Sequence, residues 1–231
     1  LLFQPKLANF DADEFISEQV FYKSKDGTRI PMFICYHKSL KRDGNSPCLL
    51  YGYGGFNISI VPSFSISHLV LMKNLRAVYA SPNIRGGGEY GRDWHHDAIL
   101  SKRQNAYYDF QCAAEYLIDN RYTNNSKLAI EGYSNGGLLV GVCVNQRPDL
   151  YGCALAHCGV MDMLKYQQFT CGHLWSSEFG LSTDPEAFDD VYAYSPLHNV
   201  SRGREYPSLL VLCADHDDRV PPLHSYKLIS E

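Results

Sequence analysis

The feature that most constrains this fold is a serine between glycines, at the point where a strand pattern changes to a helix pattern. The motif Gly-Tyr-Ser-Asn-Gly-Gly at 132–137 lies between two apolar runs. A strand, a sharp turn with a nucleophile at its tip and a helix together form a nucleophile elbow. The elbow strains the backbone of Ser134, so small residues are needed two positions before and after it, where Gly132 and Gly136 stand. The motif therefore predicts an exposed serine nucleophile at a helix N-terminus, which stabilises a developing oxyanion.

Composition excludes several classes of protein. The 231 residues carry a net charge of −4, which provides no basic surface for nucleic acid. No apolar run approaches the ~20 residues that span a membrane. The first residues lack a start methionine and the basic and apolar regions of a signal peptide. We therefore expect a cytoplasmic chain from the middle of a longer protein, with no nucleic-acid and no membrane partner.

The cysteines and histidines predict neither a metal site nor a cofactor. Most of the eight cysteines lie in apolar segments, and none forms a Cys-x-x-Cys pair. No cysteine–histidine cluster has zinc spacing. His95 and His96 are adjacent, and adjacent side chains on one element point apart. Buried free thiols in a reducing compartment are the expectation.

Strand and helix patterns alternate along the chain, which favours a mostly parallel sheet with helices on both faces. A hairpin is predicted at 17–37, with its turn at 24–27. The clearest helix pattern covers 105–122, where one apolar stripe recurs with helical period and Asn105 is a candidate cap. Further strands are predicted at 48–51, 76–80, 127–131, 153–156 and 209–213, and a helix at 62–73 that begins at Pro62. The last of these strands is purely apolar and is therefore predicted to be central.

Three candidate acids follow the last predicted strand, at the sheet edge where ligands bind. A serine hydroxyl needs a base, usually a histidine that a carboxylate orients. Asp215, Asp217 and Asp218 all stand in the loop where this carboxylate belongs, and spacing does not choose among them. Another role for them is to cap the next helix, which the pair Pro221-Pro222 is expected to begin.

The catalytic histidine is not expected within these residues. The base normally comes from a loop beyond one more strand. His224 stands only a few residues past the acid loop, and the sequence ends at Glu231. His216 and His224 are poor substitutes for that base. The chain alone is therefore predicted to be inactive.

Five motifs follow one another in order. They are Tyr-Gly-Tyr-Gly-Gly-Phe-Asn at 51–57, Asn-Ile-Arg-Gly-Gly-Gly-Glu-Tyr-Gly at 83–91, the elbow at 132–137, Asn-Gln-Arg-Pro-Asp-Leu at 145–150 and Ala-Asp-His-Asp-Asp-Arg-Val at 214–220. With these motifs, nearly all of residues 17–231 resembles the catalytic domain of the prolyl oligopeptidase family. The resemblance implies an α/β-hydrolase fold, incomplete at both ends, in which residues 1–231 form a partial peptidase domain. The family's β-propeller and its C-terminal histidine segment are absent from these residues.

The resemblance also implies a role for each matching residue of the reaction centre. Ser134 is the implied nucleophile, and Asp217 is the implied acid that orients the base. The backbone N–H of Asn135 and the hydroxyl of Tyr53 are the implied oxyanion donors, because both present a donor to charge that develops only in the transition state.

An apolar slot for proline is implied as well, because the pyrrolidine ring offers no N–H to recognise. Trp175 matches the residue that stacks on this ring, and Arg219 matches an arginine that binds a substrate carbonyl. The remaining implied walls of the slot are Phe56, Val160, Val220, Phe179 and Cys171. Phe179 stands where the family usually has tyrosine, and Cys171 where it usually has an aliphatic residue. Both changes keep the slot apolar, although they alter its shape.

The implied activity is that of a serine endopeptidase that hydrolyses short proline-containing peptides on the C-terminal side of proline through an acyl-enzyme. One alternative is a related oligopeptidase for basic residues or an acyl-aminoacyl hydrolase. The apolar set around Trp175 disfavours a basic-residue pocket, which needs acids to pair the substrate cation. Another alternative is a non-catalytic truncated form that binds peptides. The missing histidine favours that form, and the intact set of Ser134, Tyr53 and Asp217 disfavours it.

Overall fold

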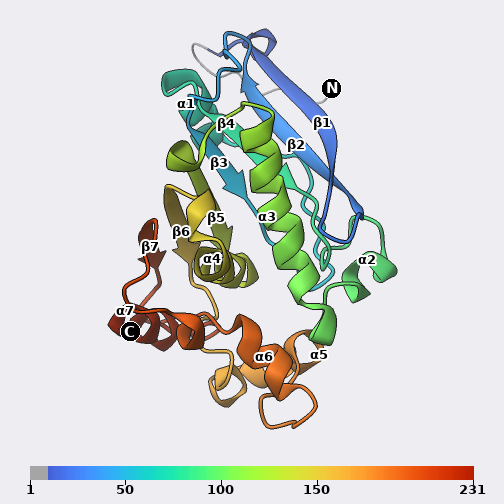
Figure 1. Ribbon diagram of the computed structural model, residues 1–231, viewed down its shortest axis with the longest axis vertical. Coiled ribbons are helices and arrows are strands. Elements are labelled where there is room, and N and C mark those ends of the chain that lie inside the picture. Colours follow the sequence, from blue (N-terminus) through green and yellow to red (C-terminus); the bar gives the residue numbers. More distant parts are fainter. Residues whose placement is uncertain (1–9) are drawn as a thin grey trace.

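A seven-stranded sheet organises residues 10–231, which are the residues that the computed structural model describes (Figure 1). The strands are β1 (Phe15–Lys23), β2 (Arg29–His37), β3 (Cys48–Tyr51), β4 (Val78–Pro82), β5 (Leu128–Tyr133), β6 (Cys153–His157) and β7 (Ser208–Leu212). Their order is β1-β2-β4-β3-β5-β6-β7. The β1–β2 hairpin and the β2–β4 pair are antiparallel, and the other pairs are parallel. The carboxyl ends of β3, β5, β6 and β7 therefore meet at one edge, as expected from the sequence.

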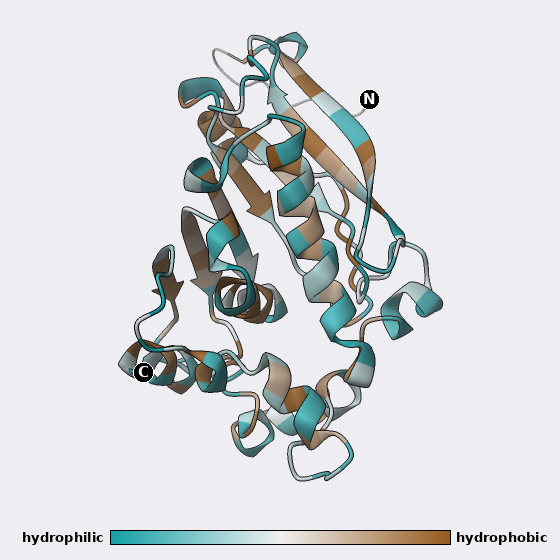
Figure 2. Ribbon diagram, in the orientation of Figure 1, coloured by the Kyte–Doolittle hydropathy of each residue, from teal (hydrophilic) through white to brown (hydrophobic). Residues whose placement is uncertain are grey.

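Helices lie on both faces of this sheet, and the two largest cover one of them. The helices are α1 (Ile66–Asn74), α2 (Arg92–His96), α3 (Gln104–Asp119), α4 (Asn135–Gln146), α5 (Ser176–Phe179), α6 (Phe188–Tyr194) and α7 (Leu223–Ser230). Helices α3 and α4 pack in front of the sheet in Figure 1. The strands behind them are mainly hydrophobic (Figure 2). Alternate residues such as Leu50 and Ile130 are fully buried there, because successive strand residues point to opposite faces.

The opposite face carries α1 and a groove of about 1090 Å³. Sheet residues that alternate with the buried set, such as Tyr51 and Glu131, line this groove. His68 of α1 stacks on Tyr79 of β4, with ring centroids 3.9 Å apart. The expected arrangement of helices on both faces is therefore present, with α1 as the helix of this second face.

Two expected helix starts are wrong. Helix α1 begins at Ile66 rather than Pro62, because the side chain of Ser65 accepts a hydrogen bond from the His68 backbone and caps it. Asn105 does not cap α3 but lies inside it, where its amide donates to the Asp97 carbonyl (2.8 Å).

The prediction that the strand at 209–213 is central is also wrong for the described residues. Strand β7 pairs with β6 alone and forms an edge of the sheet. Leu210 is 52 % exposed. An apolar composition indicates that a strand can be buried on both faces. The described residues, however, leave β7 largely exposed.

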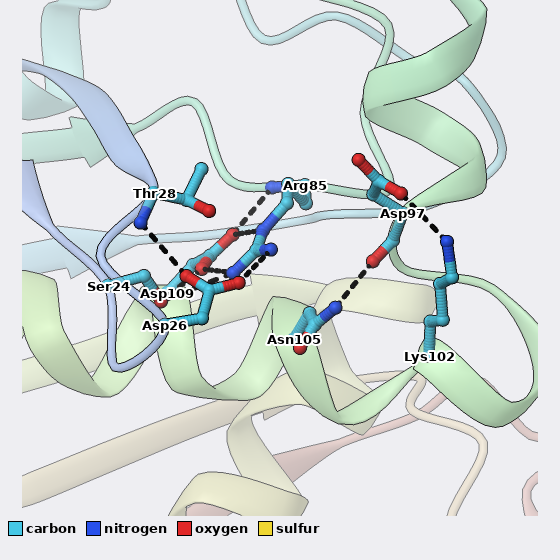
Figure 3. Close-up of polar contacts among 8 residues, drawn as sticks. All are labelled: Ser24, Asp26, Thr28, Arg85, Asp97, Lys102, Asn105 and Asp109. Carbon is cyan, nitrogen blue, oxygen red and sulfur yellow. Dashed lines mark hydrogen bonds and ion pairs between the residues drawn. The ribbon is translucent and has the colours of Figure 1, made fainter.

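A buried ion pair ties the hairpin turn to α3 and to the loop after β4 (Figure 3). Arg85 donates to both oxygens of Asp109 (2.9 and 2.7 Å) and to Asp26 in the turn (2.6 Å), and Ser24 donates to Asp109 (2.5 Å). Partial burial opposes ionisation of Asp26, but the Arg85 hydrogen bond prevails and lowers the pKa of Asp26 to about 2. Because buried charges are stable only when paired, these contacts hold the 83–91 loop in place.

That loop supports the one that follows β3. A Cβ at Gly86 would lie 2.5 Å from the Gly54 carbonyl oxygen, and the φ of Gly86 is +94°. Only glycine allows this close approach. The ion pair of Arg85 thus holds the 83–91 loop, and that loop packs against the 52–57 loop that carries Tyr53.

Candidate active site

The strand, turn and helix expected around Ser134 are present. Ser134 lies between β5 and α4 with φ 55° and ψ −112°, a conformation that non-glycine residues rarely adopt. Its backbone N–H donates to the His157 carbonyl of β6 (2.9 Å). A Cβ at Gly132 would lie 2.2 Å from the Gly136 oxygen, and one at Gly136 would lie 2.4 Å from the Gly52 oxygen. Larger residues at these two positions would therefore force the strand and the helix apart.

The two expected oxyanion donors lie on segments that touch. Asn135 is the first residue of α4, so its backbone N–H belongs to the helix N-terminus, which favours negative charge. Tyr53 lies in the loop after β3, and the Asn135 side-chain amide donates to the Tyr53 carbonyl (2.6 Å). Burial raises the pKa of Tyr53, although the charge of Arg219 lowers it. The phenol is therefore protonated at neutral pH and able to donate.

The acid loop follows β7 at the same edge of the sheet. Tyr133 is opposite His157, and His157 is opposite Leu212, so the loop lies two strands away from the elbow. Oδ1 of Asp217 accepts the backbone N–H groups of Arg219 (3.0 Å) and Val220 (2.9 Å).

The other two candidate acids are more exposed than Asp217. Asp215 pairs with His216 at the surface, where its side chain is 84 % exposed. Asp218 is exposed as well. Of the three, Asp217 is held most firmly by its own turn, which supports the choice that the family resemblance implied.

None of the histidines in residues 10–231 forms a hydrogen bond with the Ser134 hydroxyl. The two histidines in and just after the acid loop have other partners. His216 pairs with Asp215 (3.1 Å), and His224 accepts the Asp162 backbone N–H on Nδ1 (3.1 Å). His224 is also 1 % exposed, so it presents no nitrogen to a substrate. The expectation that the base lies outside these residues stays a prediction.

Because His224 is buried, we expect the folded protein to lose stability at acidic pH. Burial lowers its pKa to about 4, from 6.5. Between these values the unfolded chain binds a proton that the native chain does not, so stability falls as the pH drops from about 6.5 to about 4. The loss reaches about 3 kcal/mol by pH 4.

A neutral replacement at this position should remove the effect. His224→Gln keeps an acceptor for the Asp162 N–H and does not titrate. Its melting temperature should fall less than that of the wild-type protein between pH 7 and pH 4.5. Equal falls in the two proteins would show that His224 does not cause the effect.

Aromatic side chains of the expected slot meet around Phe179. Its ring lies 6.5 Å from Trp175 and 5.5 Å from Phe56, edge-to-face in both pairs. Tyr166, which sequence reasoning missed, stacks parallel to Trp175 at 6.4 Å. Val160 and Val220 are buried in the hydrophobic core. The structure therefore brings the three expected aromatic residues together.

Cys171 and Arg219 meet through the backbone. The Cys171 thiol and the Thr170 hydroxyl both donate to the Arg219 carbonyl, at 3.6 and 3.2 Å. Within the described part of the chain, the Arg219 guanidinium forms no ion pair. That Arg219 binds a substrate carbonyl stays a prediction.

Sequence reasoning missed two charged residues beside the elbow, Arg103 and Glu178. Both are buried, and they pair with each other (2.9 Å). Neither belongs to one of the five motifs, and an isolated charge normally indicates a solvated surface. No signal in a single sequence distinguishes them.

The cysteines are unpaired in the structure, and Cys48, Cys112 and Cys143 are buried. Burial raises the pKa of Cys143 to about 12 and that of Cys112 to about 11, which makes these thiols unreactive. Across residues 10–231, no group of three or more His, Cys, Asp or Glu side chains is arranged to hold a metal ion. No helix in that range is long and apolar enough to cross a bilayer.

The sheet, the elbow and the position of the acid loop define an α/β-hydrolase with a serine at its nucleophile position. Residues 62–231 match the model of the prolyl oligopeptidase family. The chain belongs to that family.

Three similar proteins each match nearly the whole chain or all of it. Prolyl endopeptidase of Elizabethkingia meningoseptica is 49 % identical over 231 residues, which are 100 % of this chain and 33 % of that protein. A structure from a study of two prolyl endopeptidases is 49 % identical with a TM-score of 0.95, covering 96 % of this chain and 33 % of that one. Prolyl oligopeptidase B from Galerina marginata, bound to a 35mer hydrolysis and macrocyclization substrate, is 45 % identical with a TM-score of 0.95, covering 97 % and 32 %. The chain thus spans about a third of the length of these relatives.

Proposed function

We propose that these residues belong to a serine endopeptidase that cleaves short peptides on the C-terminal side of proline. The observation that carries this proposal is the aromatic cluster of Phe56, Trp175 and Phe179 beside the elbow. Phe56 and Phe179 form its centre, and Glu178, which precedes Phe179, accepts the Phe56 backbone N–H (2.8 Å). A Cβ at Gly55 would lie 2.5 Å from the Asn135 side chain. A proline ring that packs on the partly exposed Phe56 and Trp175 therefore lies close to the nucleophile.

The reaction proceeds through an acyl-enzyme. The Ser134 oxygen attacks the carbonyl carbon of the proline residue, and its proton passes to a histidine base that Asp217 orients. The oxyanion accepts hydrogen bonds from the Asn135 N–H and the Tyr53 hydroxyl, a proposal that the contact between the Asn135 side chain and the Tyr53 carbonyl supports. The base then returns the proton to the leaving amine, and water hydrolyses the ester by the same steps. Arg219 binds a carbonyl of the substrate.

A preference for basic residues is disfavoured by the state of Glu178. It is the buried carboxylate next to the slot, but its oxygens already accept hydrogen bonds from Arg103 (2.9 Å), the Phe56 N–H (2.8 Å) and His95 (2.7 Å). A carboxylate with three donors has little capacity left for a substrate cation. An uncharged ring fits such a slot better.

The full-length protein that contains this sequence provides the test. Fluorogenic peptides that differ only in Pro, Arg or Ala before the cleaved bond should differ in kcat/KM, with proline preferred by at least about 10²-fold, because only a fitted slot gives so large a ratio. A preference for arginine would sink the proposal, and so would equal rates for the three peptides. The chain 1–231 alone is expected to be inactive, because none of its described histidine side chains forms a hydrogen bond with the Ser134 hydroxyl.

The proposal extends to the compartment. All eight cysteines are unpaired, and free thiols persist in a reducing compartment such as the cytoplasm. The proposed substrates there are short proline-containing peptides.

A further inference from the structure

One buried arginine connects the elbow to the loop that carries Tyr53. Arg103 lies at the start of α3 and is 1 % exposed. Its Nη2 donates to the side-chain oxygen of Asn135, and its Nη1 donates to Glu178 (2.9 Å). A single guanidinium therefore joins the residue after the nucleophile to the residue before Phe179.

These two partners hold the Tyr53 loop at two points. The Asn135 amide donates to the carbonyl of Tyr53 (2.6 Å), and Glu178 accepts the N–H of Phe56 (2.8 Å). A Cβ at Gly55, between these points, would lie 2.5 Å from Asn135 Nδ2 and 3.1 Å from Glu178 Oε1. The loop thus packs directly against both side chains that Arg103 binds.

The remaining polar groups of Arg103 and Glu178 are paired as well, so that the two residues and their partners form one cluster. Arg103 also donates to the Ala98 carbonyl (3.3 Å) and to the Tyr107 hydroxyl (3.4 Å), and His95 pairs with the second oxygen of Glu178 (2.7 Å). Buried charges are tolerated only with such complete pairing. Because each hydrogen bond is directional, the cluster admits few arrangements of the loop relative to the elbow.

We propose that Arg103 is a positioning residue that sets the Tyr53 hydroxyl and the Asn135 backbone N–H at the spacing an oxyanion requires. This inference rests on the proposed serine hydrolase activity. Arg103 forms no hydrogen bond with Ser134 or with the Tyr53 hydroxyl, and its hydrogen bonds reach the Tyr53 loop through Asn135 and Glu178. Its removal should reduce the stabilisation of the transition state, because a misplacement of ~1 Å at a reacting centre costs about 10²-fold in rate.

The test measures how fast a fluorophosphonate labels Ser134 in the full-length protein. The serine oxygen displaces fluoride from phosphorus and loses its proton to the base, and the phosphoryl oxygen occupies the oxyanion position. Labelling therefore reports on the oxyanion donors without depending on peptide preference. Arg103→Lys keeps the charge but cannot reach both partners in the same geometry, and it should slow labelling by about 10- to 100-fold.

A second variant separates positioning from stability. Arg103→Met/Glu178→Gln removes both charges and keeps an acceptor for the Phe56 N–H. It should melt close to the wild-type temperature and still label slowly. Arg147→Met, which breaks the partly exposed ion pairs with Glu115 and Asp149, is the control and should label at the wild-type rate.

Comparison with Tyr53→Phe decides whether Arg103 acts through the oxyanion donors. When the phenol is already absent, Arg103→Lys should slow labelling by less than about threefold, because residues that act as a unit are not additive. Equal slowing with and without the phenol would overturn the inference, as would wild-type labelling in the double variant.

If Ser134 is labelled but proline peptides are not cleaved, the proposed peptidase fails and these rates still decide the role of Arg103. Absence of labelling in the wild-type protein would overturn both.

Discussion

Replacing Ser134 with alanine is expected to lower kcat on a proline peptide by about 10⁴- to 10⁶-fold in the full-length protein. The loss is large because no other group can form the acyl-enzyme. Alanine adopts the same positive φ at a similar cost, and Gly132 and Gly136 still allow the close packing of β5 and α4. The melting temperature should therefore stay within a few degrees of the wild-type value.

Ser177→Ala is the matched control, because Ser177 is an exposed serine in α5. It should keep full activity and full labelling by a fluorophosphonate, which the mass of the intact protein reports. Ser134→Ala should gain no mass. A Ser134→Ala protein that retains more than about 1 % of wild-type activity would contradict the nucleophile assignment, because the loss expected for a nucleophile is far larger.

The second large effect is expected at Tyr53. Tyr53→Phe removes one hydroxyl and should lower kcat by about 10²- to 10³-fold with little change in KM, because an oxyanion donor acts mainly in the transition state. The ring remains, so the loop and its contact with Asn135 should persist. Steady-state kinetics on a proline peptide measure both constants.

Tyr133→Phe provides the comparison. Tyr133 is adjacent to Ser134, but it is 46 % exposed and its ring stacks on His157 at 3.9 Å. Loss of its hydroxyl should leave kcat within a few-fold of wild type. A rise in KM at constant kcat for Tyr53→Phe would show that Tyr53 packs against substrate instead of donating to the oxyanion.

Much of the fold was predictable because its signals are local. The hairpin at β1–β2, the strands β3 to β6 and the helix α3 all followed from periodicity, turn residues and glycine position. The starts of α1 and α3 were not, because the capping contact of Ser65 and the contact of Asn105 with Asp97 depend on the surrounding chain. The edge position of β7 was missed for a related reason, since composition does not reveal what covers a strand.

The sequence by itself determined the elbow and the family. Glycines at 132 and 136 are required by steric contacts within one short segment, so the motif carries its own geometry. The family resemblance also implied roles for Tyr53, Asp217 and the aromatic residues Phe56, Trp175 and Phe179. Only the tertiary structure showed that Arg103 and Glu178, 75 residues apart, pair in the interior and join the elbow to the Tyr53 loop. The physical reason is that burial decides what a charge does, and burial depends on which distant segments pack around it.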